Sequence, residues 1–173
     1  MAIALNAIAF QLAWFACVLG AAYGAPWIGL LVTMAVIALH LSRASDKASE
    51  LKLILMAGLV GIIGECALIA SGIVSYVAPA PIPFLPPFWL IALWLGFATL
   101  MNVSMAWMKN RYALAAILGL LLGPLSYIAG EKLGGMTIHE PRMIGIASIS
   151  FMWAIAMPML VKLGETWNGY RRQ

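Results

Sequence analysis

Long apolar stretches, separated by short polar or proline-rich connections, constrain this 173-residue chain more than any other feature. A helix that spans a bilayer needs about 20 mostly apolar residues, because the hydrocarbon core is about 30 Å thick. Hydrophobic residues make up 64% of the chain and charged residues only 9%, whereas soluble domains average about 25% charged residues. The sequence therefore predicts an all-α, polytopic membrane bundle, and the length leaves no room for a soluble domain.

Hydropathy and the positions of glycine and proline divide the chain into six predicted spans, which form one transmembrane domain over residues 1–173. The predicted spans cover residues 3–23, 26–41, 51–77, 87–108, 112–130 and 143–163. The segment APAPIPFLPP separates the third span from the fourth and contains five prolines in ten residues. Proline cannot continue a helix, so an extended path is predicted there.

The distribution of lysine and arginine predicts the orientation of the chain, because these residues gather on the cytoplasmic side of short loops. If the N-terminus is cytoplasmic, only Lys132 and Arg142 lie outside. The other eight basic residues then lie inside, namely Arg43, Lys47, Lys52, Lys109, Arg111, Lys162, Arg171 and Arg172. With six spans, the C-terminus is also predicted to be cytoplasmic.

Glu65 is the one Asp, Glu, Lys or Arg between Lys52 and Lys109, and it lies within an apolar run. A charge at mid-bilayer depth costs at least about 2.5–3.5 kcal/mol, so an intramembrane carboxyl is a functional-site hypothesis by default. Helical spacing places Glu65 on one face with Gly58 and Gly61, and small residues favour close helix packing. The side chain is therefore predicted to face the bundle interior. The alternative is a protonated carboxyl that only fixes helix register.

Polar side chains from other predicted spans provide hydrogen-bond partners for Glu65. Thr99 and Asn102 lie about one turn apart in the fourth span. We predict a polar cluster of Glu65, Asn102 and Thr99, with Gln11 from the first span as a further member. Tyr127 continues the glycine-rich face of the fifth span and is an additional candidate. These five residues are the predicted ligand-binding or proton-exchange site, and no catalytic residue is assigned.

No cofactor or metal site is expected. His40 and His139 lie on opposite sides of the membrane in the predicted topology, so they cannot share a zinc ion or a haem. All five lysines lie at or beyond span ends, which excludes a retinal Schiff base. Cys17 and Cys66 fall inside spans and are interpreted as structural thiols. The sequence has no phosphate-binding glycine loop, and its net charge of +4 is not interpreted as a nucleic-acid-binding feature.

Three segments, NAIAFQLAWFACVLGA, PPFWLIALWLGFATLMNVSMAWM and AILGLLLGPLSYIAGEKLGG, together resemble one small bacterial inner-membrane family. The pattern G-x-x-x-G-P-x-x-Y-x-x-G from Gly119 to Gly130 is the most specific part of this resemblance. Met152 departs from it, since many relatives are expected to carry an acidic residue there. The residues that fit the family pattern are Asn6, Gln11, Trp14, Glu65, Trp89, Trp94, Phe97, Thr99, Asn102, Pro124 and Tyr127.

Members of that family have about this length, are classed as a domain of unknown function and are often encoded near cyclopropane fatty-acid synthase-like genes. The resemblance thus implies a multi-pass protein of the bacterial inner (cytoplasmic) membrane and, by association, a link to lipid modification. It implies no reaction.

These features predict a protein that binds or transports a lipid-like or small amphipathic molecule through a mid-membrane polar site around Glu65. Two alternatives stay open. One is a membrane-embedded lipid-modifying enzyme with Glu65 as general acid or base. The other is a non-catalytic accessory subunit of a lipid-modification system, bound to a partner protein in the membrane. The scarcity of titratable groups near Glu65 favours binding or transport over catalysis. The bilayer is the expected environment, and no nucleic-acid partner is expected.

Overall fold

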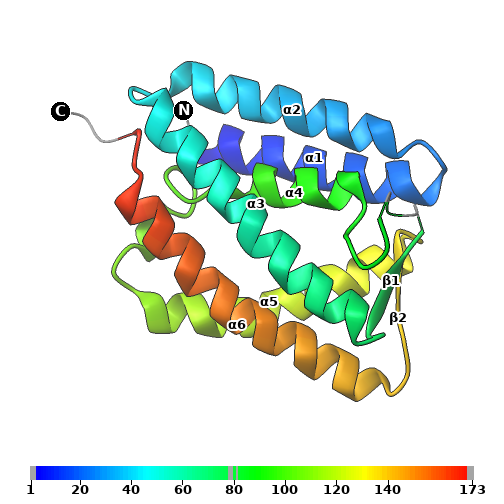
Figure 1. Cartoon of the computed structure of the whole chain (residues 1–173). Coiled ribbons are helices and arrows are strands. Elements are labelled where there is room, and N and C mark those ends of the chain that lie inside the picture. The colour runs from blue at the N-terminus through cyan, green and yellow to red at the C-terminus, as the bar shows by residue number, and fades with distance from the viewer. Residues whose placement is uncertain (1–2, 78–79, 81, 171–173) are drawn as a thin grey trace.

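A computed structural model of the chain describes residues 3–77, 80 and 82–170. These residues form six α-helices, one short 3₁₀ helix and one pair of β-strands (Figure 1). Arg171 and Arg172, and residues 78, 79 and 81 of the proline-rich connection, lie outside the described residues. In chain order the elements are α1 (Ile3–Ala22), α2 (Pro26–Arg43), α3 (Lys47–Ala70), β1 (Val74–Tyr76), α4 (Phe88–Ala98), η1 (Ala106–Met108), α5 (Tyr112–Lys132), β2 (Met136–Ile138) and α6 (Arg142–Thr166).

Within the described residues, five helices are long and apolar enough to cross a membrane: α1, α2, α3, α5 and α6. Their outer faces expose large apolar side chains, for example Leu12, Ile63 and Phe151. Exposed apolar patches of this extent mark a surface that is covered by a membrane or a partner. Together with the apolar length of the helices, this indicates a membrane protein.

The predicted fourth span, residues 87–108, is wrong as a continuous helix. Helix α4 contains only 11 residues, which at 1.5 Å per residue is about 16 Å and about half the thickness of the hydrocarbon core. After Ala98 the chain passes through a series of turns before η1 begins at Ala106. Irregular backbone at membrane depth is stable only where protein or water satisfies its polar groups.

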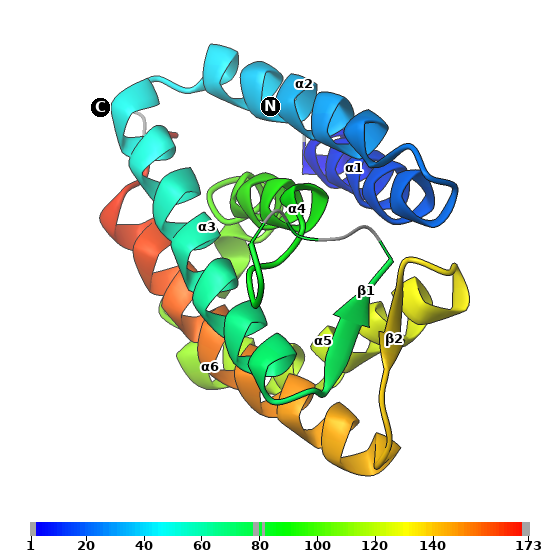
Figure 2. The same ribbon diagram turned by 45° about the vertical axis from the view of Figure 1, so that its right-hand side comes forward.

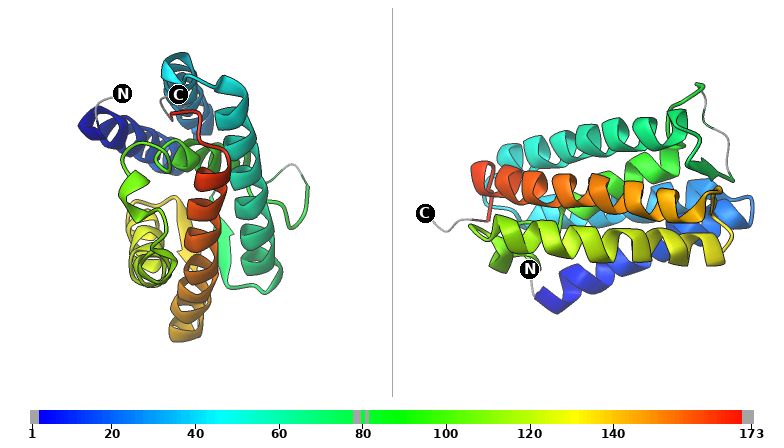
Figure 3. Two further views of the ribbon diagram at one scale, coloured as in Figure 1. Left: turned by 90° about the vertical axis from the view of Figure 1, so that its left-hand side faces the viewer. Right: turned by 90° about the horizontal axis from the view of Figure 1, so that it is seen from below.

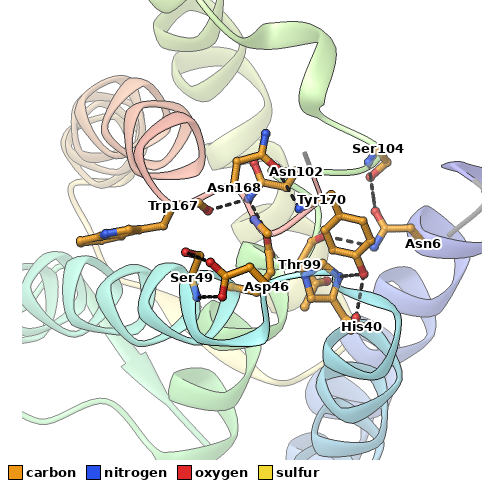
Figure 4. Close-up of polar contacts among 12 residues, drawn as sticks. Asn6, His40, Asp46, Ser49, Thr99, Asn102, Ser104, Trp167, Asn168 and Tyr170 are labelled. Carbon is orange, nitrogen blue, oxygen red and sulfur yellow. Dashed lines mark hydrogen bonds and ion pairs between the residues drawn. The ribbon is translucent and has the colours of Figure 1, made fainter. Parts of the chain in front are cut away.

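Asn6 on α1 satisfies the backbone at this interruption of α4. Its side chain is fully buried. The Asn6 Nδ2 group donates to the carbonyl oxygen of Thr99 at 3.1 Å, and Oδ1 accepts from the backbone N–H and the hydroxyl of Ser104, at 3.1 and 2.7 Å (Figure 4). One amide side chain therefore satisfies two backbone groups, the Thr99 carbonyl and the Ser104 N–H, that a continued helix would have paired.

Replacing Asn6 by alanine is expected to lower the free energy of unfolding by about 1–3 kcal/mol, because buried backbone groups at Thr99 and Ser104 lose their partner. Thermal unfolding of the purified protein in detergent measures the effect. Gln11→Ala is the matched control, since Gln11 is an exposed polar residue of the same helix. An equal loss of stability in both variants would contradict the role of Asn6.

Helix α3 begins earlier and ends earlier than the predicted span of residues 51–77. Asp46 caps its first turn by accepting from the backbone N–H groups of Ala48 and Ser49 at 3.0 and 3.1 Å. The hydrogen bond from the Ser49 hydroxyl is the main cause that lowers the pKa of Asp46, so the carboxylate cap persists well below neutral pH. At the other end, Gly72 adopts a φ of 71°, which terminates the helix.

The strands β1 and β2 were not predicted. They pair antiparallel, with Val74 opposite Ile138 and Tyr76 opposite Met136. The pair joins the segment after α3 to the segment after α5, and it closes one end of the bundle (Figure 2). Because side chains alternate along a strand, this pairing fixes the direction in which Tyr76 points.

The helices pack as two antiparallel hairpins, α1 with α2 and α5 with α6, that are joined by α3 and α4. Helix α4 packs against α1, α2 and α3 and lies inside the bundle (Figure 2). Both termini lie at the end opposite the strands (Figures 1 and 3). That end also carries Lys47 at the start of α3 and Arg111 before α5, whereas Lys132 and Arg142 lie at the strand end. Which end faces the cytoplasm stays a prediction.

Candidate functional site

The carboxyl group of Glu65 is fully buried where four elements meet. Tyr76 of β1 donates its hydroxyl to Glu65 Oε2 at 2.5 Å. Trp94 of α4 donates Nε1–H to Oε1 at 3.0 Å, and the Tyr127 hydroxyl of α5 donates to the same oxygen. Glu65 lies one and a half turns before Ala70, or about 8 Å from the strand end of α3. The site is therefore closer to the strands than to the middle of the helix.

Two glycines allow the aromatic side chains of the site to lie against the helix backbones. Gly61 precedes Glu65 by one turn of α3, and a Cβ atom at this position would lie 2.2 Å from the Trp94 ring. Gly123 precedes Tyr127 by one turn of α5, and a Cβ there would lie 2.4 Å from Trp153.

The rings of Trp94 and Trp153 stack on each other between these glycines, with centroids 4.6 Å apart and an interplanar angle of 13°. In α3, Gly61 packs against an indole and Glu65 follows one turn later. In α5, Gly123 packs against an indole and Tyr127, which donates to Glu65, follows one turn later. The aromatic packing and the polar contacts of the site depend on the same two helix faces.

Gly119 on α5 contacts backbone instead of a side chain, because a Cβ atom there would lie 2.2 Å from the backbone oxygen of Trp153 on α6. Gly119→Ala is expected to destabilise the fold by about 1–3 kcal/mol, since backbone can yield only if the two helices separate. The midpoint of thermal unfolding in detergent measures this. In the control variant Gly130→Ala, on the same helix, the new methyl group would meet its nearest neighbour at 3.6 Å. A control that loses as much stability as Gly119→Ala would contradict the packing argument.

A cavity of about 120 Å³ reaches Glu65. Its walls come mainly from α1, α4 and α5, and Met136, the first residue of β2, also lines it. Phe10 and Trp14 of α1 line it and are half-buried. Half of the lining residues are aromatic, namely Phe10, Trp14, Tyr76, Trp89, Trp94, Phe97, Tyr127 and Trp153. For comparison, an apolar cavity of about 150 Å³ binds benzene, so this one accommodates a ring or a head group rather than a whole lipid.

Two indole N–H groups of the cavity wall, those of Trp89 and Trp153, have no hydrogen-bond partner among the described residues. The indole Nε1–H of Trp89 is buried and makes no hydrogen bond to any residue that the structure describes. The Trp89 side chain is only 2% exposed and lines the cavity. A buried donor without an acceptor costs about 1–3 kcal/mol, so an acceptor atom of a bound molecule would stabilise this site.

The structure divides the predicted polar cluster. Glu65 and Tyr127 lie in contact, but the predicted contact between Glu65 and Asn102 is wrong. Asn102 Nδ2 instead donates to Glu50 Oε1 at 2.7 Å and to the carbonyl oxygen of Trp167 at 2.9 Å. Because α4 ends at Ala98, Asn102 no longer follows the helical spacing that the prediction assumed.

The other two predicted members also lie away from the carboxyl of Glu65. The Thr99 hydroxyl donates to the carbonyl oxygen of Gly96 at 2.7 Å, and Gln11 is exposed on α1. In their place the structure supplies Tyr76 and Trp94, which the sequence-based site did not include. Trp94 belongs to the residues that fit the family pattern, and this was the one available signal for it.

A second buried polar cluster, which we call the terminal cluster, consists of His40, Glu50, Asn102 and Tyr170. His40 Nε2 lies 2.7 Å from Glu50 Oε2, and both side chains are fully buried. Glu50 Oε1 also accepts from the backbone N–H of Gly169 at 2.8 Å. Figure 4 shows Tyr170 against His40 and Asn102 directed at the backbone of Trp167.

The Tyr170 hydroxyl donates to the backbone oxygen of His40 at 2.6 Å. Burial and the negative charge of Glu50 raise the pKa of Tyr170 to about 12, so the phenol remains a donor at physiological pH. The terminal cluster therefore fixes the segment after α6 onto α2 and α3. Sequence reasoning missed it, because His40 and Glu50 flank a polar connection and their pairing depends on the fold.

Comparison with known proteins gives a family but no activity. A family model described as "Protein of unknown function (DUF2878)" matches residues 3–159 of the chain. No curated protein and no solved structure matches it.

Proposed function

Because the chain belongs to the DUF2878 family, whose description names no activity, we propose a function from the geometry of the Glu65 site. The protein binds a small amphipathic molecule, lipid-like or otherwise, in the aromatic cavity beside Glu65. The observation that carries this proposal is the buried, unpartnered indole N–H of Trp89 in the wall of that cavity. Aromatic walls favour the apolar part of a ligand, and the indole donor favours an oxygen or nitrogen acceptor on the same ligand.

The proposal places the protein in the bacterial inner membrane with both termini in the cytoplasm, as the distribution of basic residues predicts. The strand end of the bundle then faces outward, and the cavity lies in the outer half of the bilayer. A ligand would enter beside α1, where the half-buried Phe10 and Trp14 line the cavity. Transport across the membrane would further require that the bound molecule reach the opposite side.

An enzymatic function is the second candidate, and the contact of Tyr127 with Glu65 is the observation that favours it. A hydroxyl held against a carboxyl can relay a proton to or from a bound substrate. In this alternative the ligand would be a lipid that is chemically changed at the site. Conversion of lipids by the purified protein, detected by mass spectrometry and abolished in Tyr127→Phe, would favour the enzyme over the binding protein.

Tryptophan fluorescence in dodecyl maltoside micelles tests the binding function, because four of the cavity-lining residues are tryptophans. The probes are benzyl alcohol, benzyltrimethylammonium and phenylacetate, which share one ring and differ in the charge of the polar group. At least one probe is expected to change the emission saturably.

A variant that fills the cavity separates specific binding from partition into the micelle. Ser126 lines the cavity, and Ser126→Phe is expected to abolish the saturable change. Leu122→Phe on the same helix is the control, because Leu122 is exposed on the outer surface and its replacement leaves the cavity open. If no probe binds, or if the Ser126 variant binds as well as the wild type, the proposed function is wrong.

A further inference from the structure

We propose that the cavity selects an organic cation, an amphipathic amine or quaternary ammonium compound, and that Glu65 provides the charge that recognises it. This inference rests on the proposed function and assigns a ligand class to the same site.

The charge of the cavity is the first argument. Glu65 is the one Asp, Glu, Lys, Arg or His among the described residues that line it. Two other acidic residues have close basic partners: Glu50 lies 2.7 Å from His40, and Glu131 lies 2.7 Å from Arg142. No basic side chain that the structure describes lies within ion-pair distance of Glu65. A buried carboxylate without a counter-charge is strongly unfavourable, and a cationic ligand would supply that charge.

The hydrogen bonds of Glu65 leave room for one more donor. A carboxylate has about four lone-pair sites. Oε1 accepts from Trp94 and Tyr127, whereas Oε2 accepts from Tyr76 alone within the described part of the chain. An ammonium N–H of a ligand can therefore donate to Oε2. A quaternary ammonium group has no N–H and would be held by charge alone.

The aromatic walls supply the second kind of recognition. A cation within about 6 Å of an aromatic ring centre is attracted by the negative face of the ring, and tryptophan is the strongest partner. Trp14 and Trp89 line the cavity and neither stacks face to face with another ring among the described residues. The ring faces and Glu65 both repel negative charge, so an anionic ligand is disfavoured even though the Trp89 N–H could donate to it.

The test compares ligands of one shape and different charge on the unmodified protein. In dodecyl maltoside at neutral pH, benzyltrimethylammonium is expected to bind at least about tenfold more tightly than benzyl alcohol, with no binding of phenylacetate. Isothermal titration calorimetry measures the affinities. Equal or tighter binding of benzyl alcohol or phenylacetate would overturn the cation inference and leave the proposed function intact. Binding of none of the three would overturn both.

Variants locate the selectivity. Glu65→Gln preserves the size of the side chain and removes its charge. It is expected to lower the affinity for benzyltrimethylammonium by at least about tenfold and to leave the affinity for benzyl alcohol unchanged. Glu140→Gln removes a carboxylate from an exposed position outside the cavity and serves as the matched control. If Glu65→Gln does not fold, Trp14→Leu is the variant to test instead. Trp14 lines the cavity, and its side chain makes no hydrogen bond in the described structure. Trp14→Leu is also expected to lower the affinity for benzyltrimethylammonium more than the affinity for benzyl alcohol. An equal loss of affinity for both probes would contradict selection by charge.

The cation could be a free amine or the head group of a lipid, and one further arm distinguishes these sources. The titration is repeated in micelles that contain phosphatidylethanolamine. A higher apparent Kd for benzyltrimethylammonium would assign the site to a lipid head group, whereas an unchanged Kd would assign it to a free amine.

Discussion

Replacing Glu50 by leucine is expected to lower the free energy of unfolding by about 3–5 kcal/mol, because each buried group that loses its hydrogen-bond partner costs about 1–3 kcal/mol. Glu50 is fully buried and accepts from Asn102 Nδ2 and from the backbone N–H of Gly169, and it pairs with His40. Leucine fills the volume but accepts no hydrogen bond. The Gly169 N–H and His40 Nε2 would then lose this partner, and Asn102 Nδ2 would keep only the carbonyl oxygen of Trp167. The segment after α6 would lose its hydrogen bond to Glu50 of α3.

Unfolding by SDS in mixed micelles measures the free energy, and hydrogen exchange at the Gly169 amide reports on the local attachment. The control variant is Glu50→Gln, whose amide oxygen can still accept from Asn102 and Gly169. Its loss of stability is expected to be clearly smaller than that of Glu50→Leu. A leucine variant as stable as the wild type would show that the terminal cluster does not hold the fold together.

Trp94→Ala is expected to have an effect of similar size, about 3–5 kcal/mol, as for other large buried aromatic residues. The substitution leaves a cavity between α3 and α6, removes the stacking partner of Trp153 and deprives Glu65 of a hydrogen-bond donor. Trp107→Ala is the control, because the Trp107 side chain is 53% exposed. Comparable losses in the two variants would contradict a central structural role for Trp94.

Gly61 provides a sharper test of the same packing. A methyl group at Gly61 would collide with the Trp94 ring, so Gly61→Ala is expected to destabilise the wild type. In the Trp94→Ala background the ring is absent, and Gly61→Ala is expected to cost little. Additive effects within about 0.5 kcal/mol in this double-mutant cycle would show that the two positions do not interact.

The positions of most helices could be predicted from the sequence, because apolar stretches of spanning length are a local property. Helices α1, α2, α5 and α6 agree with the predicted spans to within three residues at each end. The interruption of α4 could not be predicted, since it depends on Asn6, which is 93 residues from Thr99 in the chain. The strand pair between Tyr76 and Met136 is equally non-local.

Only part of the candidate site could be predicted, because its other contacts join residues that are far apart in the chain. Glu65 was identified because a lone acidic residue in an apolar run is visible in the sequence, and Tyr127 because it follows a glycine-rich face. Trp94 and Tyr76 reach Glu65 only through the placement of α4 and the pairing of β1. Asn102 was assigned to the wrong carboxyl because a continuous helix was assumed through residues 99–105.

The early end of α4 also shapes the electric field inside the bundle. The carbonyl end of a helix carries roughly half a negative elementary charge, and here that end lies in the interior rather than at the membrane surface. The neutral amide of Asn6 binds it, and no lysine or arginine is buried among the described residues. The end of α4 therefore adds a negative potential in the interior close to Thr99, which opposes the entry of a dehydrated anion at that point.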